Sequence, residues 1–291
     1  REIVRDPRLA SIDGASYMAM WLRKENLQRT LRAGYGDATI LDRFLLSPGG
    51  GLVKAQPRGV VCHWVASNMP TLGFFSLMLG FLSKNCNILK VSDASVAMLR
   101  TVLDDLARVT YDEGGRTYRG KDLAEGVALV SFPGSDLKAS EVFSLAADSR
   151  LIWGGSDSVR AILSLPQKET CDSVVFGPKY SFAVFDRGYV ESGRFREDAS
   201  KLALDIILFN QMACSSPQVV FVERSAVSIT TVAEDLADAL SSLPQRFLEQ
   251  ELPEALVSRV INARAMYLLS DDGDVRSPQG LGWTILVKHG S

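Results

Sequence analysis

The alternation of strand and helix patterns between residues 58 and 163 constrains the fold of this chain more than any other feature. Short runs of β-branched and other apolar residues alternate with longer segments in which apolar residues recur every three or four positions. The runs predict strands and the longer segments predict helices. This order is typical of an α/β fold with a parallel, doubly wound sheet. The predicted strands are 58–65, 87–91, 127–130 and 150–153, and the predicted helices are 70–83, 94–110, 137–147 and 156–163.

The pattern changes on both sides of this stretch. Residues 1–50 are predicted to form a mainly helical N-terminal segment, with one helix from about Ala15 to Arg32 and a loop at Ser47–Gly51. Residues 51–175 hold the alternating elements, and residues 176–291 read as a second α/β region. A chain of 291 residues with 46% hydrophobic residues can build cores for two such domains.

Cys214 is the candidate nucleophile of the second region. It lies in a turn between a predicted helix, 197–209, and a predicted buried strand, 218–223, and small residues flank it. A thiol in that position is approachable, and its thiolate is strongly nucleophilic even when a small fraction is ionised. Taken alone, Cys214 reads more simply as a small buried hydrophobe. The rest of the chain supplies the context that favours the nucleophile.

Composition argues against several classes of function. A net charge of −2, a pI near 5.8 and the lack of a basic, aromatic-rich patch argue against a nucleic-acid partner. The longest apolar run, 73–82, is shorter than the roughly 20 residues of a membrane span, and we expect it to be a buried helix. The scattered cysteines and the two histidines predict no metal site. They favour a reducing, cytoplasmic setting, with Cys62, Cys86 and Cys171 in the core.

Polar or glycine-containing segments lie at the carboxyl ends of three of the predicted strands. They are Ser67–Pro70, Lys90–Asp93 and Trp153–Ser156. Ligands of doubly wound sheets bind beyond the carboxyl ends of the strands, so these segments are candidate binding residues. A G-x-G-x-x-G fingerprint is missing, which counts against an ordinary Rossmann dehydrogenase. The helix N-terminus at Gly155–Ser156 still offers free N–H groups to a phosphate.

Four motifs in this order together resemble the aldehyde dehydrogenase superfamily, and within it the acyl-CoA reductases of the LuxC type. They are His63–Pro70 (HWVASNMP), Asn85–Ser92 (NCNILKVS), Ile152–Ser156 (IWGGS) and Ala213–Pro217 (ACSSP). The resemblance runs from about Gly59 to Glu223, over half of the chain.

The resemblance implies an aldehyde dehydrogenase-like fold. Residues 51–175 would be the doubly wound domain that binds a nicotinamide cofactor, and residues 176–291 the α/β catalytic domain. Fewer residues follow Cys214 than the family's catalytic and oligomerisation segments require, so the catalytic domain is expected to be incomplete. Relatives also imply a homo-oligomer, and an acyl-activating ligase and an acyltransferase as partner subunits.

The resemblance assigns catalytic roles to Cys214 and Asn68. Cys214 would attack an acyl thioester, either acyl-CoA or an acyl-carrier, and become acylated. Asn68 matches the asparagine whose amide points at the reacting carbonyl oxygen. With the backbone N–H of Cys214 it would form an oxyanion hole. The alternative for Asn68 is a cap of the helix that begins near Pro70.

The resemblance assigns cofactor binding to Lys90, Ser92, Gly155 and Ser156. Lys90 matches a lysine that contacts the adenosine ribose, and Lys90 with Ser92 could accommodate a 2′-phosphate. NADPH is therefore the expected cofactor, with NADH as the alternative because Asp93 would repel that phosphate. Gly155 and Ser156 match the turn near the pyrophosphate; the alternatives are an ordinary N-cap turn there and a surface lysine at position 90.

One departure from the superfamily bears on the reaction. Val175 stands where hydrolytic aldehyde dehydrogenases carry the glutamate that activates water, so an acyl-Cys214 would be spared hydrolysis. The expected function is NADPH-dependent reduction of a long-chain fatty acyl thioester to the aldehyde. A non-redox acyltransferase using the same acyl-cysteine, or a silent acyl-binding scaffold, are the alternatives. His63 is a conceivable base for Cys214, although a hydrogen-bonded core histidine is more common inside a strand.

Overall fold

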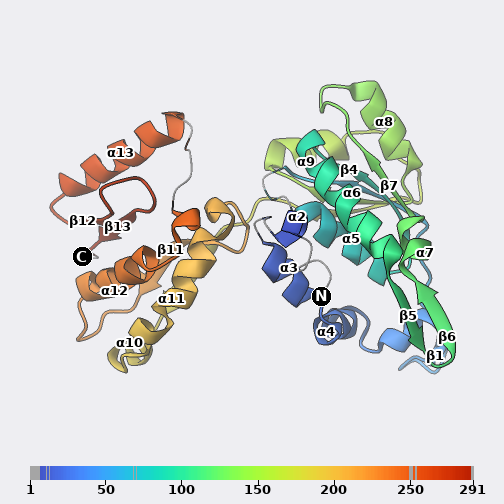
Figure 1. Ribbon diagram of the computed structural model, residues 1–291, viewed down its shortest axis with the longest axis horizontal. Coiled ribbons are helices and arrows are strands. Elements are labelled where there is room, and N and C mark those ends of the chain that lie inside the picture. The colour runs from blue at the N-terminus through green and yellow to red at the C-terminus, as the bar shows by residue number, and fades with distance from the viewer. Residues whose placement is uncertain are drawn as a thin grey trace. The chain divides into compact units, whose positions relative to one another are not determined.

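The computed structural model of the chain describes residues 7–10, 12, 14–67, 69, 71–248, 252 and 254–289. The chain divides into two compact units, residues 1–178 (unit 1) and 179–291 (unit 2) (Figure 1). Each unit has an apolar core of its own. Among the described helices, none has the length and apolar character needed to cross a lipid bilayer.

Unit 1 is built on a five-stranded sheet in the order β7-β4-β3-β8-β9. Every neighbouring pair of strands in it is parallel. The chain first winds outward from β3 through β4 to β7, and then returns to the other side of β3 for β8 and β9. This reversal confirms the predicted doubly wound sheet, and it places the switch of winding direction beside β3. The strands are β3 (Val60–Trp64), β4 (Cys86–Lys90), β7 (Val127–Val130), β8 (Ser149–Trp153) and β9 (Asp172–Phe176).

Helices cover both faces of this sheet. On one face α5 and α6 enclose a core in which Leu77, Leu89 and Leu99 are fully buried. On the other face α8 and α9 pack against Cys62 and Ile152. Burying each large aliphatic side chain contributes about 1.5–3 kcal/mol, so the two cores supply most of the stability of unit 1. The helices are α5 (Leu72–Leu82), α6 (Asp93–Arg108), α7 (Gly120–Ala124), α8 (Leu137–Ala146) and α9 (Ser156–Leu163).

The N-terminal helix differs from the prediction. The single helix expected from Ala15 to Arg32 is broken at Arg23, whose backbone is extended with ψ 143°. The first part buries Met18 against the core of α5 and α6, whereas the second part has no buried residue. The break lets one part follow the core and the other follow the surface. The elements are α2 (Pro7–Ala10), α3 (Ala15–Trp21), α4 (Lys24–Tyr35) and the 3₁₀ turn η1 (Ala38–Leu41).

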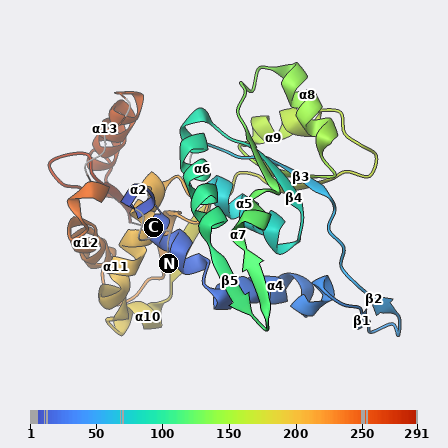
Figure 2. The ribbon, with the colours of Figure 1, turned by 45° about the vertical axis from the view of Figure 1, so that its right-hand side comes forward.

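Two hairpins project from unit 1 (Figure 2). The predicted loop Ser47–Gly51 contains the turn of the first, between β1 (Leu45–Leu46) and β2 (Leu52–Val53). The second, between β5 (Thr110–Glu113) and β6 (Arg116–Arg119), was not predicted. All residues of β5 and β6 are exposed, so no alternation of apolar and polar residues marks them. Their signal is the turn Gly114–Gly115, where both residues have positive φ as tight hairpin turns require.

Unit 2 contains a parallel pair of strands, β10 and β11, packed on one side against α11 and α12. Phe195, Leu202 and Leu236 lie at the centre of that core. An antiparallel hairpin, β12–β13, adds Ile285 to it. The elements are β10 (Ser181–Phe185), α10 (Arg187–Glu191), α11 (Arg194–Ile207), η2 (Leu208–Gln211), β11 (Pro217–Val222), α12 (Ile229–Ser241), η3 (Gln245–Phe247), α13 (Glu254–Leu268), β12 (Gly273–Arg276) and β13 (Ile285–Lys288).

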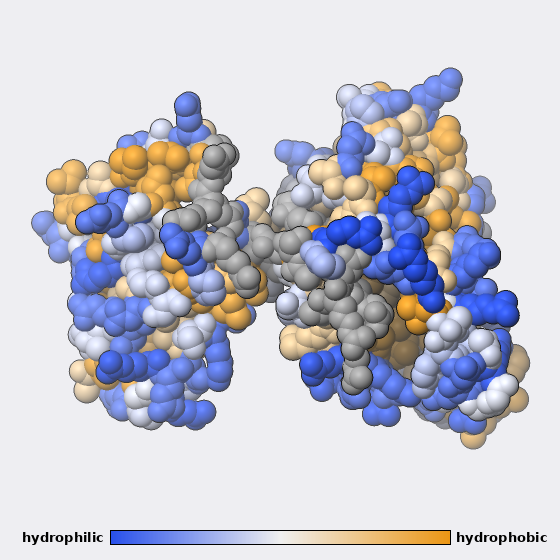
Figure 3. Space-filling view, in the orientation of Figure 1, coloured by the Kyte–Doolittle hydropathy of each residue, from blue (hydrophilic) through white to orange (hydrophobic). Residues whose placement is uncertain are grey.

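The prediction of a buried strand at 218–223, after Cys214, was wrong about its burial. β11 alternates, because its Val220 and Val222 face the helices while Val219 and Phe221 are about half exposed, at 49% and 55%. Phe182 of β10 lies beside Phe221 on the same uncovered side, with ring centroids 5.7 Å apart. Apolar side chains also gather over α13, a helix without a buried residue (Figure 3).

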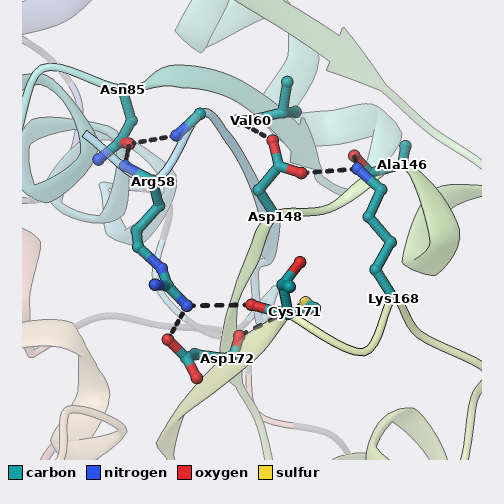
Figure 4. A network of polar contacts seen from close by, with 10 residues as sticks. Arg58, Val60, Asn85, Ala146, Asp148, Lys168, Cys171 and Asp172 are labelled. Carbon is teal, nitrogen blue, oxygen red and sulfur yellow. Dashed lines mark hydrogen bonds and ion pairs between the residues drawn. The ribbon is translucent and has the colours of Figure 1, made fainter. Parts of the chain in front are cut away.

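Polar contacts tie the amino ends of the unit 1 strands together (Figure 4). The Asp148 carboxylate accepts hydrogen bonds from Val60 N at 2.8 Å and from Lys168 Nζ at 2.7 Å. Gly59 has φ +119°, and a Cβ there would collide with that carboxylate, so the position requires glycine. Cys86, the first residue of β4, lies exposed at the start of its strand, so its predicted core position was wrong; Cys62 and Cys171 are buried as predicted.

We expect Asp148→Asn to lower the thermal midpoint of unfolding by a few degrees at pH 7. The hydrogen bond from Lys168, followed by that from Val60 N–H, lowers the pKa of Asp148 below 3.8. The ionised carboxylate therefore adds stability above that pH, and the contribution is lost as the pH falls through the folded pKa. Thermal unfolding between pH 7 and pH 3 measures the gap between variant and wild type, which should close at the acidic end.

Glu125→Gln is the matched control for this variant. Glu125 pairs with Lys121 at 3.6 Å, but both side chains are about two-thirds exposed. Exposed pairs of this kind contribute little, so the control should unfold with the wild type at every pH. Equal shifts in the two variants would show that Asp148 is an ordinary surface charge.

Candidate active site

Cys214 lies in a short turn that connects η2 to β11 in unit 2. Its side chain is exposed and its thiol is free, while Ala213 and Ser216 on either side are buried. Ser181 Oγ donates a hydrogen bond of 2.6 Å to the Cys214 carbonyl oxygen, and Ser216 N donates one of 3.0 Å to Ala213 O. The backbone of the turn is thus fixed while the sulfur stays accessible. The pairing of β10 with β11 brings Ser181 here, a long-range contact that no local sequence signal announced.

The backbone just before this turn adopts an unusual conformation. Asn210 and Gln211 have φ of 53° and 59°, in the left-handed region that residues with a Cβ rarely adopt. Gln211 Nε2 donates to Pro217 O at 2.9 Å, and Gln218 Nε2 donates to Gln211 O at 3.0 Å. These side-chain bonds hold the strained backbone in place. Such strain concentrates at functional sites, which supports the choice of Cys214.

The predicted cofactor residues lie at the carboxyl edge of the unit 1 sheet. Lys90 ends β4 and Ser92 is the N-cap of α6, whereas Gly155 and Ser156 begin α9 directly after β8. Since β4 and β8 flank β3 on its two sides, these residues border the point where the sheet changes its winding direction. The predicted position of these four residues at the carboxyl ends of the strands is confirmed, whereas their role in binding a cofactor stays a prediction.

The geometry of this edge suits a dinucleotide. No side chain caps the first turn of α9, so the backbone N–H groups of that turn are open to a phosphate. The space beside Gly155 is also open, because a Cβ there would meet no atom within 4 Å. The Lys90 Nζ lies 5.4 Å from the centroid of the Phe132 ring, a cation–π contact that holds the ammonium near the strand end. Ser92 Oγ is 3.0 Å from Ser95 Oγ. The edge thus offers two positively polarised positions for phosphate groups.

Asn68 lies outside the described residues, so its predicted role stays a prediction. Val175, which the resemblance aligns with the glutamate, is in β9 opposite Ile152 and is 41% exposed. Glu223 follows the far end of β11 and accepts a hydrogen bond from Arg187 N at 2.8 Å. Cys214 precedes β11 and Glu223 follows it. The six residues of the strand span roughly 20 Å, so Glu223 is too far from the thiol to act on it.

His63 is a core histidine and not a base. It is fully buried, with Nδ1 2.6 Å from Ser76 Oγ and Nε2 3.0 Å from Asn87 Oδ1. Burial lowers the pKa of His63 to about 4, so the ring is neutral at physiological pH. Both nitrogens are occupied, and the interpretation as a hydrogen-bonded core residue is confirmed. Within the described residues, no cluster of His, Cys, Asp and Glu could hold a metal ion.

Solved structures with the same fold are aldehyde dehydrogenases. An NADP complex of the NADP-dependent glyceraldehyde-3-phosphate dehydrogenase from Bacillus halodurans aligns with a TM-score of 0.53 and 16% identity, over 87% of this chain and 52% of that one. A propionaldehyde dehydrogenase from Clostridium phytofermentans aligns with a TM-score of 0.50 and 15% identity, over 76% and 46%. The fold is therefore aldehyde dehydrogenase-like, as predicted.

A family model described as acyl-CoA reductase (LuxC) matches residues 4–291, and the chain belongs to this family. Curated relatives are similar over most of the chain. The long-chain acyl-protein thioester reductase of Aliivibrio fischeri is 28% identical over 210 residues, which are 71% of this chain and 41% of that protein. The reductase of the same name from Vibrio harveyi is 28% identical over 218 residues, 74% and 42%. The alignments thus span about two-fifths of the length of these relatives.

We expect the buried neutral His63 to make stability depend on pH between 7 and 4. An unfolded histidine binds a proton below about 6.5, whereas His63 in the folded chain does so only near 4. The free energy of unfolding should therefore fall with decreasing pH, by on the order of 2 to 3 kcal/mol over this range. Urea unfolding at several pH values compares the wild type with His63→Gln, in which this part of the slope should be absent.

His289→Gln supplies the control, because the chain has two histidines and His289 is exposed. It should keep the slope of the wild type. An unchanged slope in His63→Gln would mean that His63 titrates alike in the folded and unfolded chains.

Proposed function

We propose that this chain acts in the NADPH-dependent reduction of long-chain acyl thioesters to aldehydes, with Cys214 as the acyl acceptor. The observation that carries the proposal is the exposed, free thiol of Cys214 in a turn whose backbone is fixed by hydrogen bonds. Membership of the LuxC family and relatives named long-chain acyl-protein thioester reductases support the substrate class. The donor would be acyl-CoA or an acyl-carrier thioester.

The proposed reaction has two stages, acylation of Cys214 and reduction of the acyl group. The Cys214 thiolate adds to the thioester carbonyl, and the bond from the carbonyl carbon to the donor sulfur breaks, leaving acyl-Cys214 and the donor thiolate, which takes a proton from water. NADPH held at the carboxyl edge of the unit 1 sheet would supply the hydride for the carbonyl carbon of acyl-Cys214 and would become NADP⁺. The thiohemiacetal alkoxide on Cys214 would then collapse with cleavage of its C–S bond, which releases the aldehyde and restores the Cys214 thiolate.

Asn68 and Val175 would determine the fate of the acyl group. The Asn68 amide and the Cys214 backbone N–H are proposed to stabilise the oxyanion in both stages, an effect worth roughly 10²–10³ in rate per donor. Val175 cannot accept a proton from water. The acyl-cysteine would therefore lack the assistance that leads to hydrolysis, and it would persist until the hydride arrives.

The residues proposed to hold the nucleotide are those of the carboxyl edge. The open first turn of α9 at Gly155 and Ser156 would receive the pyrophosphate. Lys90 and Ser92 would receive the ribose and its 2′-phosphate, and this is the reason for proposing NADPH rather than NADH. Asp93, in the first turn of α6, opposes that preference, so Lys90 must outweigh its charge.

The central prediction concerns a covalent adduct on the full-length protein. Incubation with a long-chain acyl-CoA should add one acyl mass to the wild type, and NADPH should then discharge it as aldehyde. Cys214→Ala should form no adduct. Cys86→Ala is the matched control because Cys86 is the other exposed cysteine of the described residues, and this variant should behave as the wild type. Intact-mass spectrometry and aldehyde detection make both measurements.

An adduct that forms on Cys214 and ignores NADPH would support the acyltransferase instead. Failure of the folded wild type to form an adduct across several chain lengths would overturn the role of Cys214.

Lys90→Gln should weaken binding of NADPH about tenfold while changing that of NADH much less, since it removes one charge-assisted contact to phosphate. Titration of both nucleotides measures the two dissociation constants. Lys121→Gln, on the exposed helix α7, is the control and should change neither. Equal losses for NADPH and NADH in Lys90→Gln would contradict recognition of the 2′-phosphate by Lys90.

A further inference from the structure

A chain of hydrogen bonds crosses the interior of unit 1 and ends at Trp153. Trp153 Nε1 is 2.8 Å from Ser76 Oγ, which is 2.6 Å from His63 Nδ1. His63 Nε2 is 3.0 Å from Asn87 Oδ1, and Asn87 Nδ2 is 2.8 Å from Asn85 O. His63, Ser76 and Asn87 are at most 1% exposed. The chain joins β4, β3, α5 and β8, although its members are far apart in sequence.

The groups at the two ends of this hydrogen-bond chain fix which atom donates and which accepts in every bond. The backbone carbonyl of Asn85 can only accept, so Asn87 Nδ2 donates to it and Asn87 Oδ1 faces His63. His63 Nε2 then carries the proton, and its unprotonated Nδ1 accepts from the Ser76 hydroxyl. The indole N–H of Trp153 can only donate, and it donates to the same hydroxyl oxygen. Every member is satisfied in this arrangement, which requires a neutral imidazole.

Neighbouring residues are shaped to fit the hydrogen-bonded side chains. A Cβ on Gly80 of α5 would collide with the Asn87 side chain, so glycine at that position is what lets the helix lie over the network. Trp153 also stacks face to face on Phe176 of β9, with ring centroids 3.8 Å apart and planes inclined by 6°. The indole of Trp153 is thus held at its N–H edge by the buried hydrogen bonds and on one face by Phe176.

Trp153 is the last residue before the candidate nucleotide turn. Gly154 and Gly155 follow it, and their lack of side chains leaves the backbone free to adopt many conformations. Gly154 N donates to Phe176 O at 3.3 Å, a weak bond that alone would restrain the turn poorly. Trp153 is therefore the side chain held by specific contacts at the point where this glycine pair leaves the sheet.

The geometry points to Trp153 as a positioning residue for the nucleotide phosphates, oriented through Ser76, His63 and Asn87. Trp153 acts through the backbone of the Gly154–Gly155 turn and needs no contact with the nucleotide. The inference rests on the proposed function, because it presumes that the turn binds NADPH.

Ser76→Ala in the full-length protein tests the inference, with titration of NADPH as the readout. The substitution leaves the Trp153 N–H and His63 Nδ1 without their shared partner, so the ring is released and the dissociation constant should rise about tenfold. Trp153→Phe keeps an aromatic ring on Phe176 and removes the N–H, and should have a similar effect. Both substitutions break the same hydrogen bond, between Trp153 and Ser76. The double variant should therefore bind NADPH no more weakly than the weaker-binding single variant.

Ser144→Ala is the matched control. Ser144 is also a fully buried serine of unit 1 and bonds a side chain, Arg150 Nη1 at 3.0 Å, but on the opposite face of the sheet. It should lose comparable thermal stability and bind NADPH as the wild type does. Acylation of Cys214 by acyl-CoA, which needs no nucleotide, should proceed at the wild-type rate in Ser76→Ala.

The outcomes separate the two hypotheses. A wild type that does not bind NADPH would overturn the proposed function. A wild type that binds it, together with Ser76→Ala and Trp153→Phe variants that bind it equally well, would overturn the positioning role alone. Equal losses of affinity in Ser76→Ala and Ser144→Ala would do the same, because they would assign the effect to general destabilisation.

Discussion

The burial of β3 on both faces is the constraint on which unit 1 depends. Val61, Cys62, His63 and Trp64 are each at most 5% exposed, and the strand pairs with β4 on one side and β8 on the other. A parallel strand in this position needs helices on both faces. The same central position makes β3 the switch point of the sheet, so the requirement that stabilises the core also creates the place where a ligand can bind.

The two edges of this sheet use polar groups in different ways. At the amino edge, Asp148 accepts from Lys168 Nζ and from Val60 N, and Asn85 separately accepts from Gly59 N, so these polar groups are used to hold the start of β3. At the carboxyl edge, the first turn of α9 has no side-chain cap. Unit 1 therefore uses one edge for stability and keeps hydrogen-bonding capacity available at the other, a division expected of a binding domain.

The alternation of apolar runs predicted four strands of the central sheet and the helices α5, α6, α8 and α9 well, because each of these elements packs apolar residues of its own local pattern against the sheet. The same pattern did not predict elements whose formation or burial depends on contacts with other parts of the fold. β9 and the β5–β6 hairpin carry no periodic apolar signal, and the exposed side of β11 follows from where the helices lie. The motifs predicted that Lys90, Ser92, Gly155 and Ser156 lie at the carboxyl ends of strands, and they do. Ser181 and Ser76 depend on contacts between distant segments, which a single sequence does not reveal.

The buried hydrogen-bond chain shows why a histidine occupies the middle of a core strand. An apolar residue at position 63 would avoid the cost of burying an imidazole, which is large enough to hold the pKa of His63 near 4. The imidazole connects the Asn87 amide on one neighbouring strand to a hydroxyl on α5, and through it to Trp153 on the other neighbouring strand. Dispersion contacts between apolar side chains could fill the same space but would not fix the orientation of the indole. The polar core of β3 therefore costs stability and defines geometry at the edge where the proposed chemistry needs it.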